Sequence, residues 1–436
     1  MLEKIFKLKD HQTTVRTEIV AGIITFLTMS YILVVNPNIL SASGMDKSAL
    51  FTATALASVL GTLFMAFIPN LPVAQAPGMG LNSFFAFSVV LGLGYSWQMA
   101  LTAVFIEGII FVLLTFFNVR EMIVKSIPAT IKNAIPVGIG LFITFLGLQN
   151  GGIIVRDENT MLTLGEMGNP HVWVAFLGLF VTGVLYYKQV HGAFLIGIVA
   201  ATLFALAMGL VEMPQNGIVA LPPDISPIFM KFEWHNIFTL DMLIVVFTFL
   251  FVNLFDTIGT LLGVASKIGI TDKSGSFPQI KKALFADALG TTFGAMLGTS
   301  TVTSYVESAS GVAVGGRTGL TALSTAVMFL LALFLAPLFL MVPAAATAPA
   351  LILVGLFMIT SVVKINFDDM TEAIPAFLTI VMMPFAFSIA QGIVFGMLSF
   401  VILKAFSGQA KHISVTMWVI FVLFIGKMIL DGMHVI

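Results

Sequence analysis

Apolar segments long enough to cross a membrane recur along almost the whole chain. Because an α-helix rises about 1.5 Å per residue, roughly 20 apolar residues cross the hydrocarbon core of a bilayer. The pattern of long apolar segments separated by short polar loops predicts an all-α polytopic membrane protein. The continuous apolar segments lie at 17–37, 48–68, 97–117, 134–149, 172–188, 192–211, 240–266, 280–298, 318–341, 347–363, 371–389, 390–405 and 413–430.

Two further apolar segments are interrupted by glycine, proline and polar residues. They are 73–92, which contains the stretch APGMGLNSFFAF, and 301–316, which begins TVTSYVESASG. Thr301, Thr303 and Tyr305 alternate as residues do along a short strand. Backbone that leaves the helix inside a membrane must be covered by protein or line a cavity. We therefore expect each segment to hold a short extended stretch followed by a half-helix that faces a polar pocket.

The order of the segments predicts an internal repeat. A hydrophilic interruption near 212–240 separates two halves, and the broken segment stands third among the spans of each half. The fifth spans also share related stretches, GLFIT at 140–144 and GLFMIT at 355–360. Paired broken helices in an internal repeat are typical of secondary transporters. We predict a first seven-span repeat at 1–212, a connection at 213–239, a second seven-span repeat at 240–405 and a separate hydrophobic helix at 406–436.

The distribution of charge predicts the orientation in the membrane. With a cytoplasmic N-terminus, most Lys and Arg residues of the loops lie inside, and the acidic loops at 150–169 and 212–240 lie outside. Since seven spans is an odd number, the second repeat is inverted relative to the first. The charged residues before the first span do not form a cleavable signal peptide. We expect the protein in the cell (inner) membrane, with an amphipathic stretch at 118–133 along its interface.

Composition agrees with this picture and excludes a soluble protein. Of the 436 residues, 58% are hydrophobic and 9% are charged, whereas a soluble domain carries about 25% charged residues. Lipid must therefore be the solvent for most of the outer surface. The net charge of −1 does not favour a nucleic-acid partner, and the absence of cysteine excludes disulfides. We expect no cofactor and no metal, while a homodimer is compatible with the sequence.

Polar residues inside the spans are the candidates for chemistry, because charge is costly at membrane depth. Asp256 follows more than two turns of apolar residues, and Glu307 and Asn82 stand in the two broken segments. Glu107 and Asp287 also lie within spans, where such carboxylates can serve as structural hydrogen-bonding groups. The residues that we expect to line the substrate site are Thr28, Asn82, Phe84, Phe255, Asp256, Thr257, Glu307 and Ser308.

The expected pocket suits a flat, neutral ligand with several N–H donors, such as a nucleobase. Carboxylates accept hydrogen bonds, an asparagine offers donors and an acceptor, and phenylalanine offers a flat face. Two acids with no fixed cation suit an anion poorly. As buried carboxylates, Asp256 and Glu307 can also take up and release protons near neutral pH, which a proton-coupled carrier requires. No HExxH or GxSxG-type motif lies in a span, which argues against an intramembrane enzyme.

At these residues the sequence resembles the azaguanine-resistance-type purine permeases, which are proton-coupled carriers of hypoxanthine, guanine and adenine. The resemblance is collinear along nearly the whole chain. The matching stretches include LKDHQTTVRTEIVAGIITFLTMSYILVVNPNIL at 8–40, APGMGLNSFFAF at 76–87, FDTIGTLLGVA at 255–265, TSTVTSYVESASGVAVGGRTGLTAL at 299–323 and EAIPAFLTIVMMPFAFSIAQGIVFG at 372–396.

The resemblance implies the fold of uracil and xanthine permeases. That fold has fourteen spans in two inverted repeats, with short strands in spans 3 and 10 and with a core domain that moves against a gate domain. It also implies that Asn82, Asp256 and Glu307 bind the purine. This sequence has Asn253 where the family often has a second acid, which leaves the proton stoichiometry open. The alternatives are another nucleobase such as uracil or xanthine, an anion carrier or channel of the same fold (the SulP type), and a non-transporting receptor.

Overall fold

The structure, a computed structural model, describes residues 2–116, 128–158, 160–214, 217–235, 237–271 and 277–434. Within this part of the chain, nine helices are long and apolar enough to cross a membrane. Shorter apolar helices lie at Met79–Gly92, Ala193–Ala207, Met370–Phe385 and Val415–Gly426. The chain is therefore a multi-pass, predominantly helical membrane protein, which confirms the predicted fold class. Of the amphipathic stretch expected at 118–133, residues 118–127 lie outside the described part.

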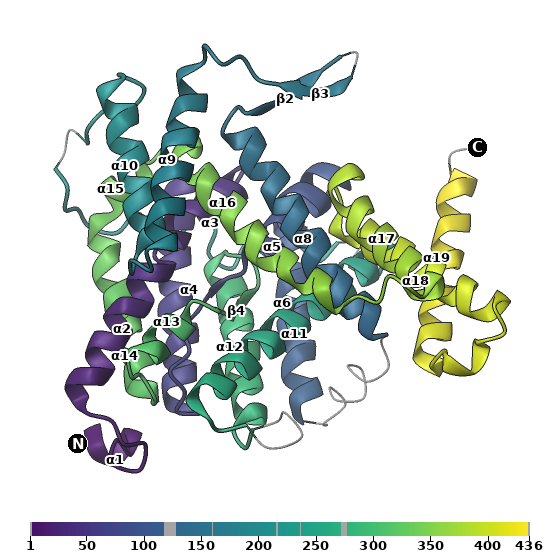
Figure 1. The fold of residues 1–436 in the computed structure, drawn as a ribbon, viewed down its shortest axis with the longest axis horizontal. Helices are drawn as coiled ribbons and strands as arrows, with labels where there is room; N and C mark the ends of the chain where they lie inside the picture. The colour runs from purple at the N-terminus through teal and green to yellow at the C-terminus, as the bar shows by residue number, and fades with distance from the viewer. Residues whose placement is uncertain are drawn as a thin grey trace.

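The elements follow one another in the predicted order (Figure 1). The first half contains α1 (Leu2–Phe6), α2 (Val15–Met29), α3 (Ile32–Ser41), α4 (Lys47–Phe67), β1 (Gln75–Pro77), α5 (Met79–Ser83), the π-helical segment η1 (Phe84–Gly92), α6 (Trp97–Phe116), α8 (Ala129–Asn150), the hairpin β2 (Ile154–Asp157) and β3 (Met161–Leu164), α9 (Pro170–Tyr187) and α10 (Ala193–Ala207). The first predicted span is divided, because α2 ends before Tyr31 and α3 begins directly after it.

The second half repeats this order. It contains α11 (Leu240–Ile268), α12 (Ile280–Leu297), β4 (Val302–Ser304), α13 (Ser308–Ala313), α14 (Gly319–Ala332), η2 (Leu333–Leu335), α15 (Ala336–Leu340), α16 (Ala344–Ile359), η3 (Thr360–Lys364), α17 (Met370–Phe385) and α18 (Ile389–Phe406). After it come η4 (Ala410–His412) and the C-terminal helix α19 (Val415–His434). Polar side chains begin several helices, as where Thr239 accepts a hydrogen bond from the backbone N–H of Met242 at the start of α11.

Both broken segments contain the short strand that the sequence predicts. β1 pairs antiparallel with β4, with Ala76 opposite Thr303. Beyond the strands, the backbone N–H of Gly78 donates to the carbonyl of Thr301 and that of Tyr305 to the carbonyl of Ala74, each at 3.0 Å. Neither chain segment could satisfy its backbone groups alone at this depth. The two segments therefore complete each other where the repeats meet.

The helix packing follows the inverted repeat. α4 packs against α12, its counterpart in the second half, and each also packs on the other half's fourth span, α4 on α14 and α12 on α6. A second group forms in the same way around α8 and its counterpart α16, where α8 packs on α17 and α16 on α9. Purple α2 lies beside green α14 in Figure 1 for the same reason. These two groups correspond to the core and gate domains expected for the fold.

Glycines at equivalent positions of the two halves allow close helix packing. A Cβ on Gly140 of α8 would lie 2.6 Å from the carbonyl oxygen of Gly355 in α16. A Cβ on Gly197 of α10 would overlap the hydroxyl of Thr182, just as one on Gly396 of α18 would overlap the hydroxyl of Thr379. Small residues at such crossings let helix backbones approach closely in membranes. The related stretches of the two halves thus mark the crossings of the gate domain.

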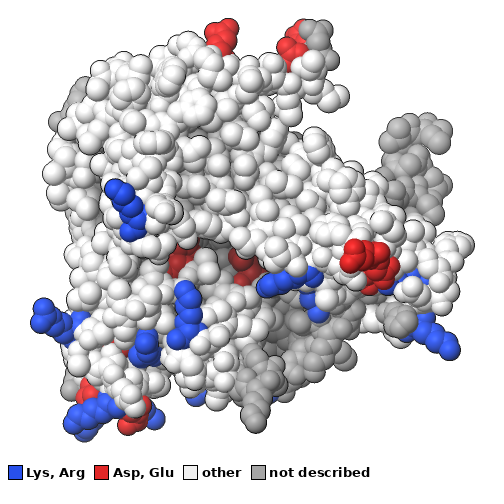
Figure 2. Space-filling model, in the orientation of Figure 1, with Lys and Arg blue, Asp and Glu red and all other residues white. Residues whose placement is uncertain are grey.

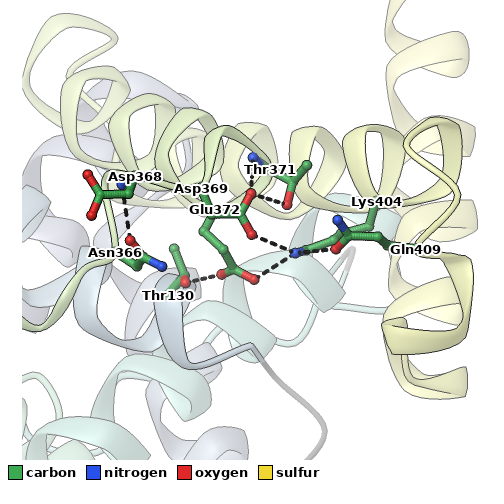
Figure 3. A network of polar contacts seen from close by, with 8 residues as sticks. All are labelled: Thr130, Asn366, Asp368, Asp369, Thr371, Glu372, Lys404 and Gln409. Atoms are coloured by element: carbon green, nitrogen blue, oxygen red, sulfur yellow. Dashed lines mark hydrogen bonds and ion pairs between the residues drawn. The ribbon is translucent and has the colours of Figure 1, made fainter.

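Ion pairs and a hydrogen bond hold three helices of the gate together at one end (Figure 3). Lys404 of α18 lies 2.9 Å from the Glu372 carboxylate and 3.5 Å from that of Asp369, at the start of α17. Glu372 also accepts a hydrogen bond from the hydroxyl of Thr130 in α8. Hydrogen bonds from Thr371, and then the Lys404 cation, hold the pKa of Asp369 below its ordinary value. This network fixes the beginning of α8 relative to α17 and α18.

Replacing Gly140 with alanine should destabilise the gate, because the new methyl group meets backbone rather than a movable side chain. We expect a loss of about 1–3 kcal/mol, seen as a lower apparent Tm of the detergent-solubilised protein. Gly183→Ala in α9 is the matched control, since no atom lies within 4 Å of a Cβ placed there. Equal Tm values for Gly140→Ala and the unmodified protein would contradict the close crossing of α8 and α16.

Candidate functional site

The paired broken segments form one wall of a cavity between the core and the gate. This central cavity has a volume of about 120 Å³. Its core side includes Tyr31, Thr303, Tyr305, Asp256 and Glu307, and its gate side includes Ile135, Ile139, Val354, Phe357 and Met358. The core side therefore supplies the polar and acidic groups, whereas the gate side is apolar.

Asp256 presents its carboxylate to the central cavity from the middle of α11. The residue is exposed although it lies deep in a membrane-spanning helix. Within the described residues, no side chain or backbone group donates a hydrogen bond to its carboxylate. Figure 2 shows acidic groups at the bottom of a hollow on this face, with basic side chains on the surface around it. The carboxylate is thus available to a ligand that enters the cavity.

Glu307 lies directly before α13 and has one oxygen already engaged. The hydroxyl of Tyr31 donates to Glu307 Oε1 at 2.5 Å. The ring of Tyr31 packs against Phe194 of α10, with 5.2 Å between the ring centroids. Tyr31 therefore connects an acid of the core to an aromatic side chain of the gate. The hydroxyl of Tyr305, in contrast, donates to the carbonyl of Pro77 at 2.5 Å and stays within the core.

A second, larger cavity adjoins the first at Glu307. This vestibule has a volume of about 490 Å³ and shares Val306, Glu307 and Phe357 with the central cavity. Its other lining residues include Thr28, Gln189, His191, Lys267 and Ser310. Val306 is 57% exposed between the two cavities. The vestibule therefore gives a polar approach to the central cavity from the end of α11.

A fully buried polar network lies behind the central cavity. The carboxylate of Asp287 in α12 accepts hydrogen bonds from Gln75 Nε2 at 2.9 Å, Ser304 Oγ at 3.0 Å and Thr257 Oγ1 at 2.9 Å. These donors come from β1, β4 and α11. Buried polar groups at membrane depth need such partners. Asp287 therefore ties both strands and α11 to α12.

Glu107 extends this network to α6. It accepts hydrogen bonds from Asn253 Nδ2 at 2.9 Å and from the hydroxyl of Thr301 at 3.1 Å. Asn253 stands where the resembling family often has a second acid, and the orientation of its amide follows from its bond to Glu107. Its Oδ1 lies 3.2 Å from the hydroxyl of Thr257. Both Glu107 and Asp287 thus have hydrogen-bonding partners of the structural kind considered from the sequence.

The structure brings together only part of the predicted site. Phe255, Asp256 and Glu307 line the central cavity, and Thr28 lines the vestibule. The other four predicted residues are buried and line neither cavity. Asn82 accepts a hydrogen bond from Ser300, Phe84 packs edge-on against Phe249 at 4.8 Å, Thr257 bonds Asp287 at 2.9 Å, and Ser308 Oγ accepts from the backbone N–H of Ala74 at 3.0 Å.

Sequence reasoning missed several lining residues, namely Tyr31, Tyr305 and Phe357. Tyr31 stands where the first span is divided, and Tyr305 precedes Glu307 by two residues. The first span is divided where α2 ends at Met29 and the chain turns at Ser30. No glycine or proline stands at this turn, so nothing in the sequence indicates that the span is broken beside Tyr31. Phe357 lies in an ordinary apolar span, so its role as a cavity wall depends on the packing of α16 against the core.

The chemistry of the cavity is that of a hydrogen-bond acceptor. Two carboxylates face it, and among the described residues that line it there is neither lysine nor arginine. Lys132 of α8 stands over the ring of Phe255, with Nζ 5.9 Å from its centroid, and Lys267 lines the vestibule. Phe255 and Phe357 add flat apolar faces. The arrangement therefore fits a planar ligand that donates hydrogen bonds.

Comparison with known proteins gives a consistent result. Residues 16–395 match the Permease family. The chain is 45% identical over 434 residues to the adenine permease AdeP of Escherichia coli, covering 100% of this chain and 97% of that protein. It is also 45% identical over 435 residues to the guanine/hypoxanthine permease PbuG of Bacillus subtilis, covering 97% of this chain and 98% of that protein.

Among solved structures, the chain resembles the transmembrane domain of a cyanobacterium bicarbonate transporter, BicA. The TM-score is 0.63 at 16% identity, over 87% of this chain and 97% of that domain. At this level of identity the likeness shows the fold alone. It agrees with the two inverted repeats and with the division into core and gate.

Because the chain contains no cysteine, the cavities can be probed with single cysteine substitutions. Val306→Cys should react rapidly with a small, hydrophilic thiol reagent, since Val306 is 57% exposed between the cavities. Ser308→Cys is the control, because Ser308 is buried two residues away and is 0% exposed. Labelling would be measured by mass spectrometry of the purified protein. Equal reactivity of the two variants would contradict the described cavities.

Proposed function

The chain belongs to the Permease family, and we propose that it imports purine nucleobases by proton symport. The relatives it matches along almost their whole length are named as permeases for adenine and for guanine and hypoxanthine. The observation that carries the proposal is the exposure of two carboxylates, Asp256 and Glu307, to one cavity without a fixed cation. Such groups can both bind the N–H donors of a base and hold a proton.

In this proposal, the purine occupies the central cavity. Asp256 and Glu307 accept hydrogen bonds from its N–H groups, and Phe255 contacts its face. Thr28 lines the vestibule and contacts the purine on its way to or from the central cavity. Asn82, Phe84, Thr257 and Ser308 lie behind the cavity wall and support it. Asp256 is the proposed proton carrier, because its carboxylate has no protein donor among the described residues, whereas that of Glu307 is stabilised by Tyr31.

Movement of the core against the gate would give alternating access to this site. The polar groups of the cavity belong to the core and the apolar wall belongs to the gate. A rigid-body displacement of the gate would therefore open and close the cavity without disturbing the carboxylates. The vestibule contains Lys267, which the distribution of charge assigns to the cytoplasmic side, so we propose that it is the inner exit route.

We propose that the protein lies in the cell (inner) membrane, in contact with lipid, with its N-terminus in the cytoplasm. We also propose repeat boundaries at 1–212 and 240–405, a connection at 213–239 and an additional helix region at 406–436. We further propose that two copies of the chain can associate as a homodimer within the membrane.

Anion transport is the main rival, because the likeness in fold extends to a bicarbonate transporter. An anion would have to approach two carboxylates in the central cavity, where the described lining offers no cationic side chain. The negative charges of the anion and of the carboxylates would repel each other strongly within one small cavity of low dielectric constant. The chemistry of the cavity therefore favours the purine. Uptake of labelled bicarbonate or sulfate that unlabelled adenine does not inhibit would instead support anion transport.

Purine uptake should depend on an inward proton gradient. In proteoliposomes, labelled adenine should accumulate when the outside is acidic, and accumulation should collapse on addition of a protonophore. A sodium gradient of equal size at symmetric pH is the matched control and should drive no accumulation. Uptake that follows sodium and ignores the pH gradient would overturn proton coupling. Absence of saturable uptake of any purine would overturn the proposed function itself.

A further inference from the structure

Most of the hydroxyl groups that line the central cavity donate their hydrogen to a group of the protein and not into the cavity. The cavity is lined by five hydroxyl-bearing residues, Tyr31, Thr260, Thr303, Ser304 and Tyr305. Tyr31 donates to Glu307 and Tyr305 donates to the carbonyl of Pro77, each at 2.5 Å. Each hydroxyl has a single hydrogen, so a hydroxyl that donates inside the protein can only accept from a ligand.

Ser304 is oriented in the same way by the buried acid of α12. Its Oγ donates to Asp287 Oδ1 at 3.0 Å, and it lies 3.4 Å from Gln75 Nε2, which donates to it. Gln75 also donates to Asp287 Oδ1 at 2.9 Å. The position of Ser304 is therefore set by one acceptor and one donor from the protein. No hydrogen remains for a ligand.

The orientation of Thr303 follows from its neighbour Thr257. The two hydroxyl oxygens are 2.9 Å apart, and from this distance alone either could donate. Thr257, however, is also 2.9 Å from Asp287 Oδ2 and 3.2 Å from Asn253 Oδ1. Both of these are acceptors, because Asn253 uses its Nδ2 to donate to Glu107 at 2.9 Å.

Whichever acceptor takes the single hydrogen of Thr257, that hydrogen is not available to Thr303. The contact between the two threonines is then a hydrogen bond only if Thr303 donates. Thr303 therefore directs its hydrogen away from the cavity, and its remaining lone pair can only accept. Four of the five lining hydroxyls, together with the carboxylates of Asp256 and Glu307, thus require hydrogen-bond donors from a ligand.

We propose that Asp287 fixes the hydroxyls of Ser304, directly, and of Thr303, through Thr257, as acceptors and so makes the site prefer purines that carry an exocyclic amino group. This inference rests on the proposed function and narrows its substrate class to aminopurines such as adenine and guanine. An exocyclic amino group adds N–H donors to those of the ring. Hypoxanthine has ring N–H groups but no amino group. Asp287 and Thr257 act as positioning residues, since neither lines the cavity.

Ligand pairs that differ only in the amino group test this proposal. Guanine should compete for labelled adenine uptake about tenfold better than hypoxanthine, and adenine better than unsubstituted purine by a similar factor, as expected for one additional good hydrogen bond. Equal competition within both pairs would overturn the proposal. Failure of every purine to compete would instead overturn the proposed function, so the two failures are distinguishable.

Variants of Thr257 test the relay. Thr257→Val removes the partner that takes the hydrogen of Thr303, so Thr303 becomes free to donate to a ligand. The guanine-to-hypoxanthine ratio should then fall toward one, whereas Thr257→Ser should keep it. A merely structural role would weaken both ligands equally, and an unchanged ratio in Thr257→Val would overturn the relay.

A second pair keeps the test decisive if Thr257→Val does not fold. Thr303→Val removes the acceptor that faces the ligand, while Thr303→Ser retains it. The ratio should fall in the valine variant and persist in the serine variant. An unchanged ratio in a folded Thr303→Val protein would likewise overturn the proposal.

Discussion

The fold depends on satisfying backbone and carboxylate groups at the depth where two helices are broken. β1 and β4 share one antiparallel ladder, and each supplies the hydrogen bonds that the other lacks. The buried carboxylate of Asp287 binds both strands, through Gln75 and Ser304, and binds α11 through Thr257. In a medium without water, an unpaired group here would cost several kcal/mol. This constraint holds the two repeats in register and thereby brings Asp256 and Glu307 to the same cavity.

A division of labour between the core and the gate follows from that constraint. The core carries the broken segments and the acids, and it is held together by fully buried hydrogen bonds. The gate presents an apolar wall. The ion pairs of Lys404 hold its helices α17 and α18 together, and the hydrogen bond from Thr130 to Glu372 attaches α8 to them. Tyr31 is a point of contact between the two, since its hydroxyl bonds Glu307 and its ring packs on Phe194. A change in the hydrogen bonding of Glu307 would therefore reach, through Tyr31, the contact between Tyr31 and Phe194 of the gate.

Much of the fold could be predicted from the sequence, because lipid imposes a simple length and polarity rule on each span. The short strands of the broken segments could also be predicted. Glycine and proline interrupt the helix in the first segment, and Thr301, Thr303 and Tyr305 alternate as along a strand in the second. Asp256 and Glu307 could be singled out as rare acids at membrane depth. Asn82 and Thr257 were equally plausible by type, but the rotation of their helices directs them to Ser300 and Asp287.

Side-chain partners far apart in sequence were beyond such reasoning. Tyr31 and Glu307 are separated by 276 residues along the chain. They meet because α2, which ends just before Tyr31, packs against α13, which begins just after Glu307. The orientation of Thr303 likewise depends on a chain of contacts through Thr257 to α12. Spacing along one helix does not encode such contacts. They arise from the crossing of helices, whose close approach the glycines permit.

The central claim is that Asp256 couples the purine to a proton, and Asp256→Asn tests it most directly. The amide keeps the size and hydrogen-bonding capacity of the side chain but cannot titrate. In proteoliposomes with an inward proton gradient, the account predicts that this variant no longer concentrates labelled adenine, whether it loses binding or still exchanges adenine across the membrane. Asp368→Asn, in the exposed loop before α17, is the matched control and should accumulate adenine normally. Accumulation by Asp256→Asn that is driven by the pH gradient to the level of the unmodified protein would contradict the account.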